Sequence, residues 1–96
     1  MSYGRKIVLH CPRGYDPRLD AMIEQFILDG VVFVGIVGKD CAKIEDIIDE
    51  LVTGDASDAN RFILTSSHPD ESLEKAIQFA QSLTEEYAGE AQIVEL

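Results

Sequence analysis

The feature that most constrains the fold is an unbroken apolar run, VVFVGIV, at residues 31–37. A strand with one face in water alternates apolar and polar side chains, whereas a strand buried on both faces does not. Strands buried on both faces are typical of parallel sheets, because crossover helices cover both sides. The run therefore predicts a strand in a parallel sheet.

Strand-like and helix-like segments alternate along the rest of the chain. Three other short apolar segments are predicted strands: RKIVLHC (5–11), RFILTS (61–66) and AQIVEL (91–96). The segments between the strands carry apolar residues at helical spacing. These stripes are Leu19, Met22, Ile23, Phe26 and Ile27; Ile44, Ile47, Ile48, Leu51 and Val52; and Leu73, Ala76, Ile77, Ala80, Leu83 and Tyr87. The order is therefore βαβαβαβ.

Capping residues set the expected ends of the helices. The first helix begins at Asp16 and Pro17 and ends at Gly30, and the second runs from Asp40 to Gly54. The third covers about residues 70–88, and Ser67 with Asp70 forms its expected capping box. The polar loop TGDASDAN (53–60) separates the second helix from the third strand.

The alternation predicts one α/β domain over residues 1–96, a three-layer sandwich with a four-stranded parallel sheet of the flavodoxin-like or Rossmann-like kind. We favour the strand order 2-1-3-4. The alternative, 3-2-1-4, would place the very apolar second strand at the centre. In the favoured order the first helix lies alone on one face of the sheet. The remaining apolar sheet surface on that face predicts a homodimer.

Composition and charge exclude several classes of partner. The chain has 8 basic and 18 acidic residues and a formal net charge of −10, which disfavours nucleic acid and anionic membranes. No apolar run approaches the roughly 20 residues of a membrane span, and the start MSYGRKIVLH lacks the features of a signal peptide, so we expect a cytoplasmic protein. The segment GIVGKD matches neither common nucleotide-binding glycine motif, so no cofactor is predicted.

The fold predicts where a site should lie. Ligands of open parallel sheets bind at the carboxyl ends of the strands, where the strand order reverses, and this point is expected between the first and third strands. The loops expected there are HCPRGYD (10–16), GKDC (38–41) and SSHPDE (66–71). The predicted ligand-binding residues are His10, Cys11, Arg13, Lys39, Ser66, Ser67 and His68. They suit a small anionic ligand or a protein partner.

Cys11 and His68 are the catalytic candidates. The C-x-x-G of Cys11 to Gly14 resembles the phosphocysteine loop of cellobiose-type sugar phosphotransferase IIB domains and, more distantly, the C-x5-R loop of low-molecular-weight tyrosine phosphatases. The resemblance implies phosphate chemistry at a thiolate. However, Pro12 and Pro17 each remove a backbone donor that a phosphate cradle needs, and the next arginine, Arg18, gives C-x6-R.

A metal site would use Cys11, Cys41, His68 and either His10 or Asp70. Those residue types suit zinc, but the chain has neither the C-x2-C nor the H-x3-H spacing that makes such a prediction strong. The two cysteines are thirty residues apart and are expected to be free thiols. No metal is predicted.

Residues 35–80 resemble a family of small bacterial α/β proteins of unknown function, through the segments IDELVTGD and LTSSHPDESLEKAIQFA. This resemblance implies a bacterial cytosolic protein and supplies no activity. Two hypotheses follow. The first, which we favour, is a non-enzymatic binding or interaction module with its cleft at the carboxyl edge of the sheet. The alternative is a small enzyme or phosphocarrier that uses Cys11 with His68.

Overall fold

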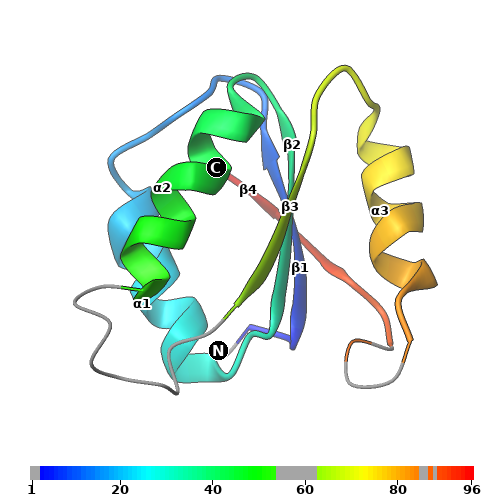
Figure 1. Cartoon of the computed structure of the whole chain (residues 1–96), viewed down its shortest axis with the longest axis horizontal. Helices are drawn as coiled ribbons and strands as arrows, with labels where there is room; N and C mark the ends of the chain where they lie inside the picture. The colour runs from blue at the N-terminus through cyan, green and yellow to red at the C-terminus, as the bar shows by residue number, and fades with distance from the viewer. Residues whose placement is uncertain (1–2, 54–62, 85–86, 88) are drawn as a thin grey trace.

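A computed structural model describes residues 3–53, 63–84, 87 and 89–96 and has four parallel strands alternating with three helices (Figure 1). The predicted α/β class is confirmed. The elements are β1 (Lys6–Cys11), α1 (Leu19–Asp29), β2 (Phe33–Gly38), α2 (Cys41–Thr53), β3 (Leu64–His68), α3 (Leu73–Ser82) and β4 (Gln92–Glu95).

The strand order is β3-β2-β1-β4. The favoured order 2-1-3-4 was therefore wrong, and the alternative with the second strand inside the sheet is the one observed. The physical reason is burial, because residues 33–37 of β2 are all buried and an edge position would expose their backbone to water. The strand order reverses between β1 and β4, not between β1 and β3.

The helices are divided unequally between the two faces, as Figure 1 shows with the sheet seen nearly edge-on. From β1 to β2 to β3 the chain moves in one direction, so right-handed crossovers place α1 and α2 on the same face. The connection from β3 to β4 returns across the sheet and places α3 on the opposite face. We had expected the first helix to lie alone, and the structure instead leaves α3 alone.

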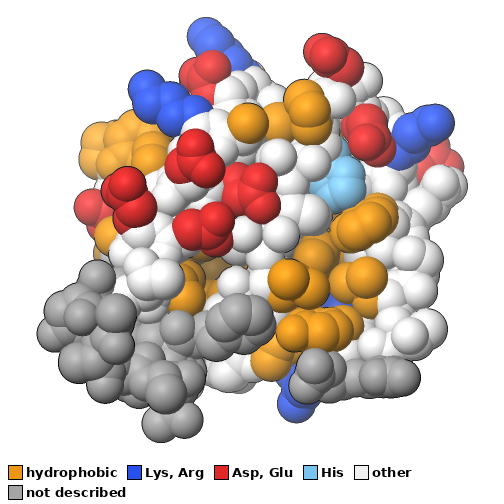
Figure 2. All heavy atoms as spheres, in the orientation of Figure 1, with side chains coloured by type: hydrophobic (Ala, Val, Ile, Leu, Met, Phe, Trp, Pro, Cys, Tyr) orange, Lys and Arg blue, Asp and Glu red, His pale blue; other side chains and the backbone are white. Residues whose placement is uncertain are grey.

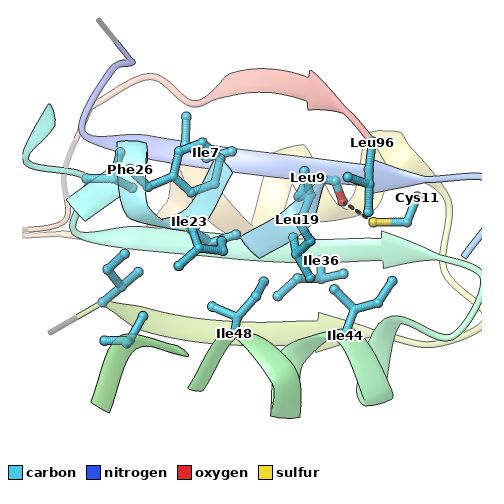
Figure 3. Packing of buried hydrophobic residues seen from close by; sticks show 14 of the residues in the cluster. Ile7, Leu9, Cys11, Leu19, Ile23, Phe26, Ile36, Ile44, Ile48 and Leu96 are labelled. Atoms are coloured by element: carbon cyan, nitrogen blue, oxygen red, sulfur yellow. Dashed lines mark hydrogen bonds between the residues drawn. The ribbon is translucent and has the colours of Figure 1, made fainter. Parts of the chain in front are cut away.

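We call the sheet face covered by α1 and α2 the two-helix face, and the face covered by α3 the one-helix face. The larger apolar cluster lies on the two-helix face, where Ile7, Leu9 and Ile36 pack against Phe26 and Ile48 (Figure 3). The cluster on the one-helix face is smaller, and its buried members are Val8, Phe33, Val37, Ala76 and Ala80.

Lys6 connects α3 to the sheet. Its side chain is only 1% exposed, and its Nζ donates a hydrogen bond to the carbonyl oxygen of Ala80, near the end of α3. A cation at this position is favourable, because the carbonyls at the end of a helix carry partial negative charge. Burial lowers the pKa of Lys6.

The helix ends differ in part from those expected. The first helix ends at Gly30 in the left-handed conformation, as predicted, but α1 begins at Leu19, after Arg18. The third helix is shorter than predicted and begins after Ser72, whose hydroxyl accepts the amide of Lys75. The expected capping box at Ser67 was wrong, because β3 continues through His68.

The predicted end of the second helix at Gly54 and most of the loop 53–60 lie outside the described residues. In the part of the chain that is described, none of the helices combines the length and the apolar character needed to cross a membrane.

Candidate functional site

Cys11 is the last residue of β1 and points into the two-helix face. Its side chain is completely buried, and its thiol donates a weak hydrogen bond to the Leu9 carbonyl oxygen 3.9 Å away (Figure 3). Burial, followed by the nearby Cys41, raises the pKa of the Cys11 thiol to about 12. A nucleophilic cysteine needs a thiolate at neutral pH, so this environment favours an unreactive thiol.

Backbone contacts close the space beside Cys11. Its carbonyl oxygen accepts the amides of Gly14 and Lys39, at 3.2 Å and 2.9 Å, which joins the loops that follow β1 and β2. Gly38 has φ of 119°, and a Cβ at this position would lie 2.5 Å from the Cys11 carbonyl oxygen. Arg13 and Lys39 are exposed on these loops.

An apolar side chain fills the region where the strand order reverses. Leu96 follows β4, and its amide donates to the His10 carbonyl oxygen at 2.9 Å. Its side chain is nearly buried in the same cluster as Cys11 and lies beside it in Figure 3. In open parallel sheets the ligand usually binds at the point where the strand order reverses. Here the Leu96 side chain fills that point and is part of the core.

The structure does not bring Cys11 and His68 together. Register pairs Cys11 with Gly38 and His68 with Val37, so β2 separates the two candidates. They also point to opposite faces, because Cys11 joins the cluster of the two-helix face whereas His68 contacts Phe79 of α3.

The same separation divides the residues considered for a metal site. Cys11 and Cys41 lie in the two-helix cluster, whereas the register places His10 on the same face as His68. Residues 3–53, 63–84, 87 and 89–96 contain no group of three or more histidine, cysteine or acidic residues arranged to hold a metal ion.

His68 is held by polar groups on both sides of its ring. The ring is buried, with 5% of the residue exposed. Its Nε2 lies 2.9 Å from Ser66 Oγ, and its Nδ1 lies 3.7 Å from a carboxylate oxygen of Glu71. Hydroxyl, imidazole and carboxylate therefore follow one another in the order of a general-base relay.

Aromatic rings surround this polar group. The centroids of Phe79 and His68 lie 5.0 Å apart in an edge-to-face arrangement, and Phe33 lies 6.2 Å from Phe79. Gly35 makes room for them, since a Cβ there would come within 3.2 Å of the Phe33 ring and 3.5 Å of Ser66 Oγ. Phe79 is nevertheless 42% exposed, so one side of the aromatic group faces water.

β3 is an edge strand, with β2 on one side and no other strand of the described chain beside it. The amide of Leu64 donates to the Val32 carbonyl oxygen in the direction of β2. Backbone groups alternate in direction along a strand. The backbone amides of Ser66 and His68 therefore also point toward β2, whereas the amides and carbonyls of Thr65 and Ser67 point outward.

Two different surfaces flank this edge, as Figure 2 shows. Acidic side chains of α2 gather on one side; this helix carries Glu45, Asp46, Asp49 and Glu50. Asp49 reaches β3, where Thr65 Oγ1 donates to its carboxylate at 2.8 Å. Hydrophobic side chains lie on the other side, between β3 and α3, beside a histidine. The exposed residues Leu64 and Phe79 belong to this side, since Leu64 is in register with Phe33 and Phe79 contacts His68.

Of the seven predicted ligand-binding residues, Ser66 and His68 are in contact through their side chains, and Lys39 is joined to Cys11 only through its backbone amide. Ser67 belongs to the outward-facing backbone of β3, and His10 approaches Glu95, with Nδ1 3.9 Å from the carboxylate. Sequence reasoning missed Leu64, Phe79 and Glu71. Phe79 offered a signal, because this large apolar residue falls outside the apolar stripe of its helix.

A family model, described as a domain of unknown function (DUF7684), matches residues 6–95. The chain belongs to this family. The resemblance to proteins of unknown function is therefore confirmed, and no similarity to sugar phosphotransferase domains was found. No match was found among curated proteins, and none among solved structures.

Proposed function

We propose that the protein is a binding or interaction module whose partner surface is the edge of β3 that no other strand of the described residues pairs with. The observation that carries this proposal is the edge itself, a strand of five residues without a charged aspartate, glutamate, lysine or arginine. Natural proteins protect edge strands with charges, proline or bulges, because unpaired backbone groups invite another strand. β3 has none of these inside its bounds, and Leu64 and Phe79 expose apolar surface beside it.

The other edge of the sheet supports this choice of surface by contrast. β4 has only four residues and ends in the charged Glu95. On that strand the side chain of Gln92 accepts the amide of Gly4 at 2.8 Å. Ile93 of β4 is 51% exposed, so both edges expose apolar surface, but β4 is shorter and carries a charge, whereas β3 has an uncharged edge beside Leu64 and Phe79.

A selection experiment tests the proposal. The intact chain is used to select binders from a random library of displayed peptides, with two variants for comparison. Ser67→Pro removes one outward amide and leaves the amides that point toward β2, whereas Ser67→Ala keeps the backbone donor. We expect enriched peptides that bind wild type and Ser67→Ala but lose binding to Ser67→Pro. Failure to enrich any such peptide would overturn the proposal.

A second candidate function is acyl transfer by Ser66, favoured by the 2.9 Å contact between Ser66 Oγ and His68 Nε2 and by Glu71 beside the ring. In this reaction Ser66 Oγ bonds to the acyl carbon and His68 takes the hydroxyl proton, which then passes to the leaving alcohol. A fluorophosphonate probe should label Ser66 in the wild type and leave Ser66→Ala unlabelled. Absence of labelling on the folded wild type would exclude this chemistry.

A further inference from the structure

The chemistry on the two sides of β3 specifies a class of partner. Resting on the proposed function, we propose that the partner is an extended segment that alternates cationic and apolar side chains and adds to β3 as a fifth strand. In an extended strand, successive side chains point to opposite faces of the sheet. Such a segment can therefore meet α2 with one set of side chains and α3 with the other.

The backbone of β3 sets the register of the added strand. Thr65 and Ser67 each direct one amide and one carbonyl away from β2, so the edge offers four backbone hydrogen bonds over three residues. Main-chain pairing of this kind supplies affinity in strand addition, and pockets for alternate side chains supply specificity.

Acidic groups line the side of the edge that faces α2. Asp49 lies against Thr65, with a hydrogen bond of 2.8 Å, and is exposed. Glu45 lies four residues earlier on α2 and so on the same side of that helix. A lysine or arginine next to Thr65 or Ser67 would therefore meet carboxylates, in a protein whose formal net charge is −10.

Apolar and aromatic groups line the side that faces α3. Leu64, Ser66 and His68 share this face of β3 through their register with Phe33, Gly35 and Val37. Leu64 and Phe79 keep 36% and 42% of their surface exposed. Valine or leucine side chains of an added strand would cover these two residues.

Charge also argues against a second copy of this chain as the occupant. An antiparallel pair of β3 strands keeps the same faces of the two sheets aligned, so the α2 helices of both copies would lie on the same face. Each helix has four acidic residues and one basic residue, and the two acidic groups would repel each other. A cationic segment removes this repulsion.

The test uses a labelled peptide with blocked ends in which lysine and valine alternate over about seven residues, a typical strand length. The control peptide has the same composition and charge, but its lysines and valines are in two blocks. We expect the alternating peptide to bind the intact protein at least about tenfold more tightly, because only its two faces match the two flanks of β3. Fluorescence anisotropy measures both affinities.

Matched variants locate the binding. Glu45→Gln with Asp49→Asn should weaken the alternating peptide by about three- to tenfold, whereas Asp20→Asn with Glu90→Gln, which changes the net charge equally, should have little effect. Leu64→Lys should also weaken binding, and this variant serves if Ser67→Pro fails to fold. Binding should protect the amides of Thr65 and Ser67 from hydrogen exchange.

The outcomes separate this inference from the proposed function. Equal binding of the two lysine–valine peptides, or equal effects of the two double variants, would reduce the binding to non-specific attraction and overturn the inference. If the library instead yields segments of another pattern that depend on Ser67, the partner class is wrong and the interaction module stands. Concentration-dependent dimers in sedimentation that Ser67→Pro abolishes would identify a second copy as the occupant and would also overturn the inference.

Discussion

Cys11 and His68 end strands that are separated by one neighbour, yet their surroundings have little in common. Cys11 points into the two-helix face, where apolar side chains enclose it and burial raises its pKa to about 12. His68 points into the one-helix face, where Ser66, Glu71 and Phe79 contact its ring. Two helices seal the first environment, whereas one helix leaves part of the second exposed.

This difference teaches that the position of a residue at the carboxyl edge does not by itself make it available for function. The direction of the side chain matters as much, and it alternates with every step along a strand. Both candidates lie near the same edge, and only the side of the sheet distinguishes the core position of Cys11 from the partly open surroundings of His68.

The largest expected change in stability comes from replacing a buried phenylalanine of the two-helix face, and a phenylalanine of the one-helix face serves as the comparison. Phe26→Ala should lower the free energy of unfolding by about 3–5 kcal/mol, because the ring is completely buried and contacts Tyr3 at a centroid distance of 4.7 Å. Phe79→Ala should lower it by only about 1 kcal/mol, since much of its ring is already in water. Urea denaturation measures both, and equal losses would contradict the division into a sealed and a partly open face.

The next effect concerns the closed end of β1. Gly38→Ala should lower the free energy of unfolding by about 2–4 kcal/mol, because the new Cβ meets the Cys11 carbonyl at 2.5 Å and the residue has positive φ. Gly30→Ala is the control, with φ of 82° and open space around the added atom. Its loss should be about 1 kcal/mol, from conformation alone. If Gly38→Ala left the free energy of unfolding unchanged, the space beside the Cys11 carbonyl would not be tightly closed.

The buried thiol predicts a dependence of stability on pH. The folded state holds the Cys11 proton until about pH 12, whereas the unfolded thiol ionises near 9.0. Between these values the unfolded state binds fewer protons, so stability falls as pH rises, by up to about 1.4 kcal/mol per unit.

Urea denaturation under reducing conditions at pH 8, 9 and 10 measures this slope, with Cys11→Ala as the control. The wild type should lose stability more steeply than the variant above pH 9. Parallel curves would mean that the thiol is more accessible than the structure indicates.

The smallest effect concerns the single helix of the one-helix face. Ser72→Ala should lower the free energy of unfolding by about 1 kcal/mol, because it removes the hydroxyl that accepts the Lys75 amide. Ser67→Ala should change it by less than about 0.5 kcal/mol, since the residue is only partly buried and does not cap α3. A larger loss of stability for Ser67→Ala would indicate that Ser67 caps α3, as the sequence predicted.

Local patterns predicted most of the fold. The unbroken apolar run became the buried strand β2, and the helical stripes at residues 19–27 and 44–52 lie within α1 and α2. The strand order was harder to predict, because several orders satisfy the same local patterns. Burial of β2 selected the observed order, and that order in turn decided which helix lies alone.

The candidate site was less predictable, because it depends on which side chains share a face. Sequence spacing showed Cys11 and His68 near strand ends but could not show that they face apart. β3 also continues through His68, beyond the expected strand end at residue 66, and this brings the His68 ring into contact with Ser66 on the same face. The contact of Phe79 with His68 depends on how α3 packs against β3, which sequence spacing does not show.

The contact between Lys6 and Ala80 connects the interior of the molecule with this outer surface. Lys6 belongs to β1, two strands away from β3, and it holds the carbonyl next to Phe79 along the chain. Lys6→Met would remove this donor and leave the buried Ala80 carbonyl without that partner, which would weaken the attachment of α3 to the sheet. Phe79 belongs to the same helix, so the position of an exposed ring beside β3 depends on a buried residue of β1.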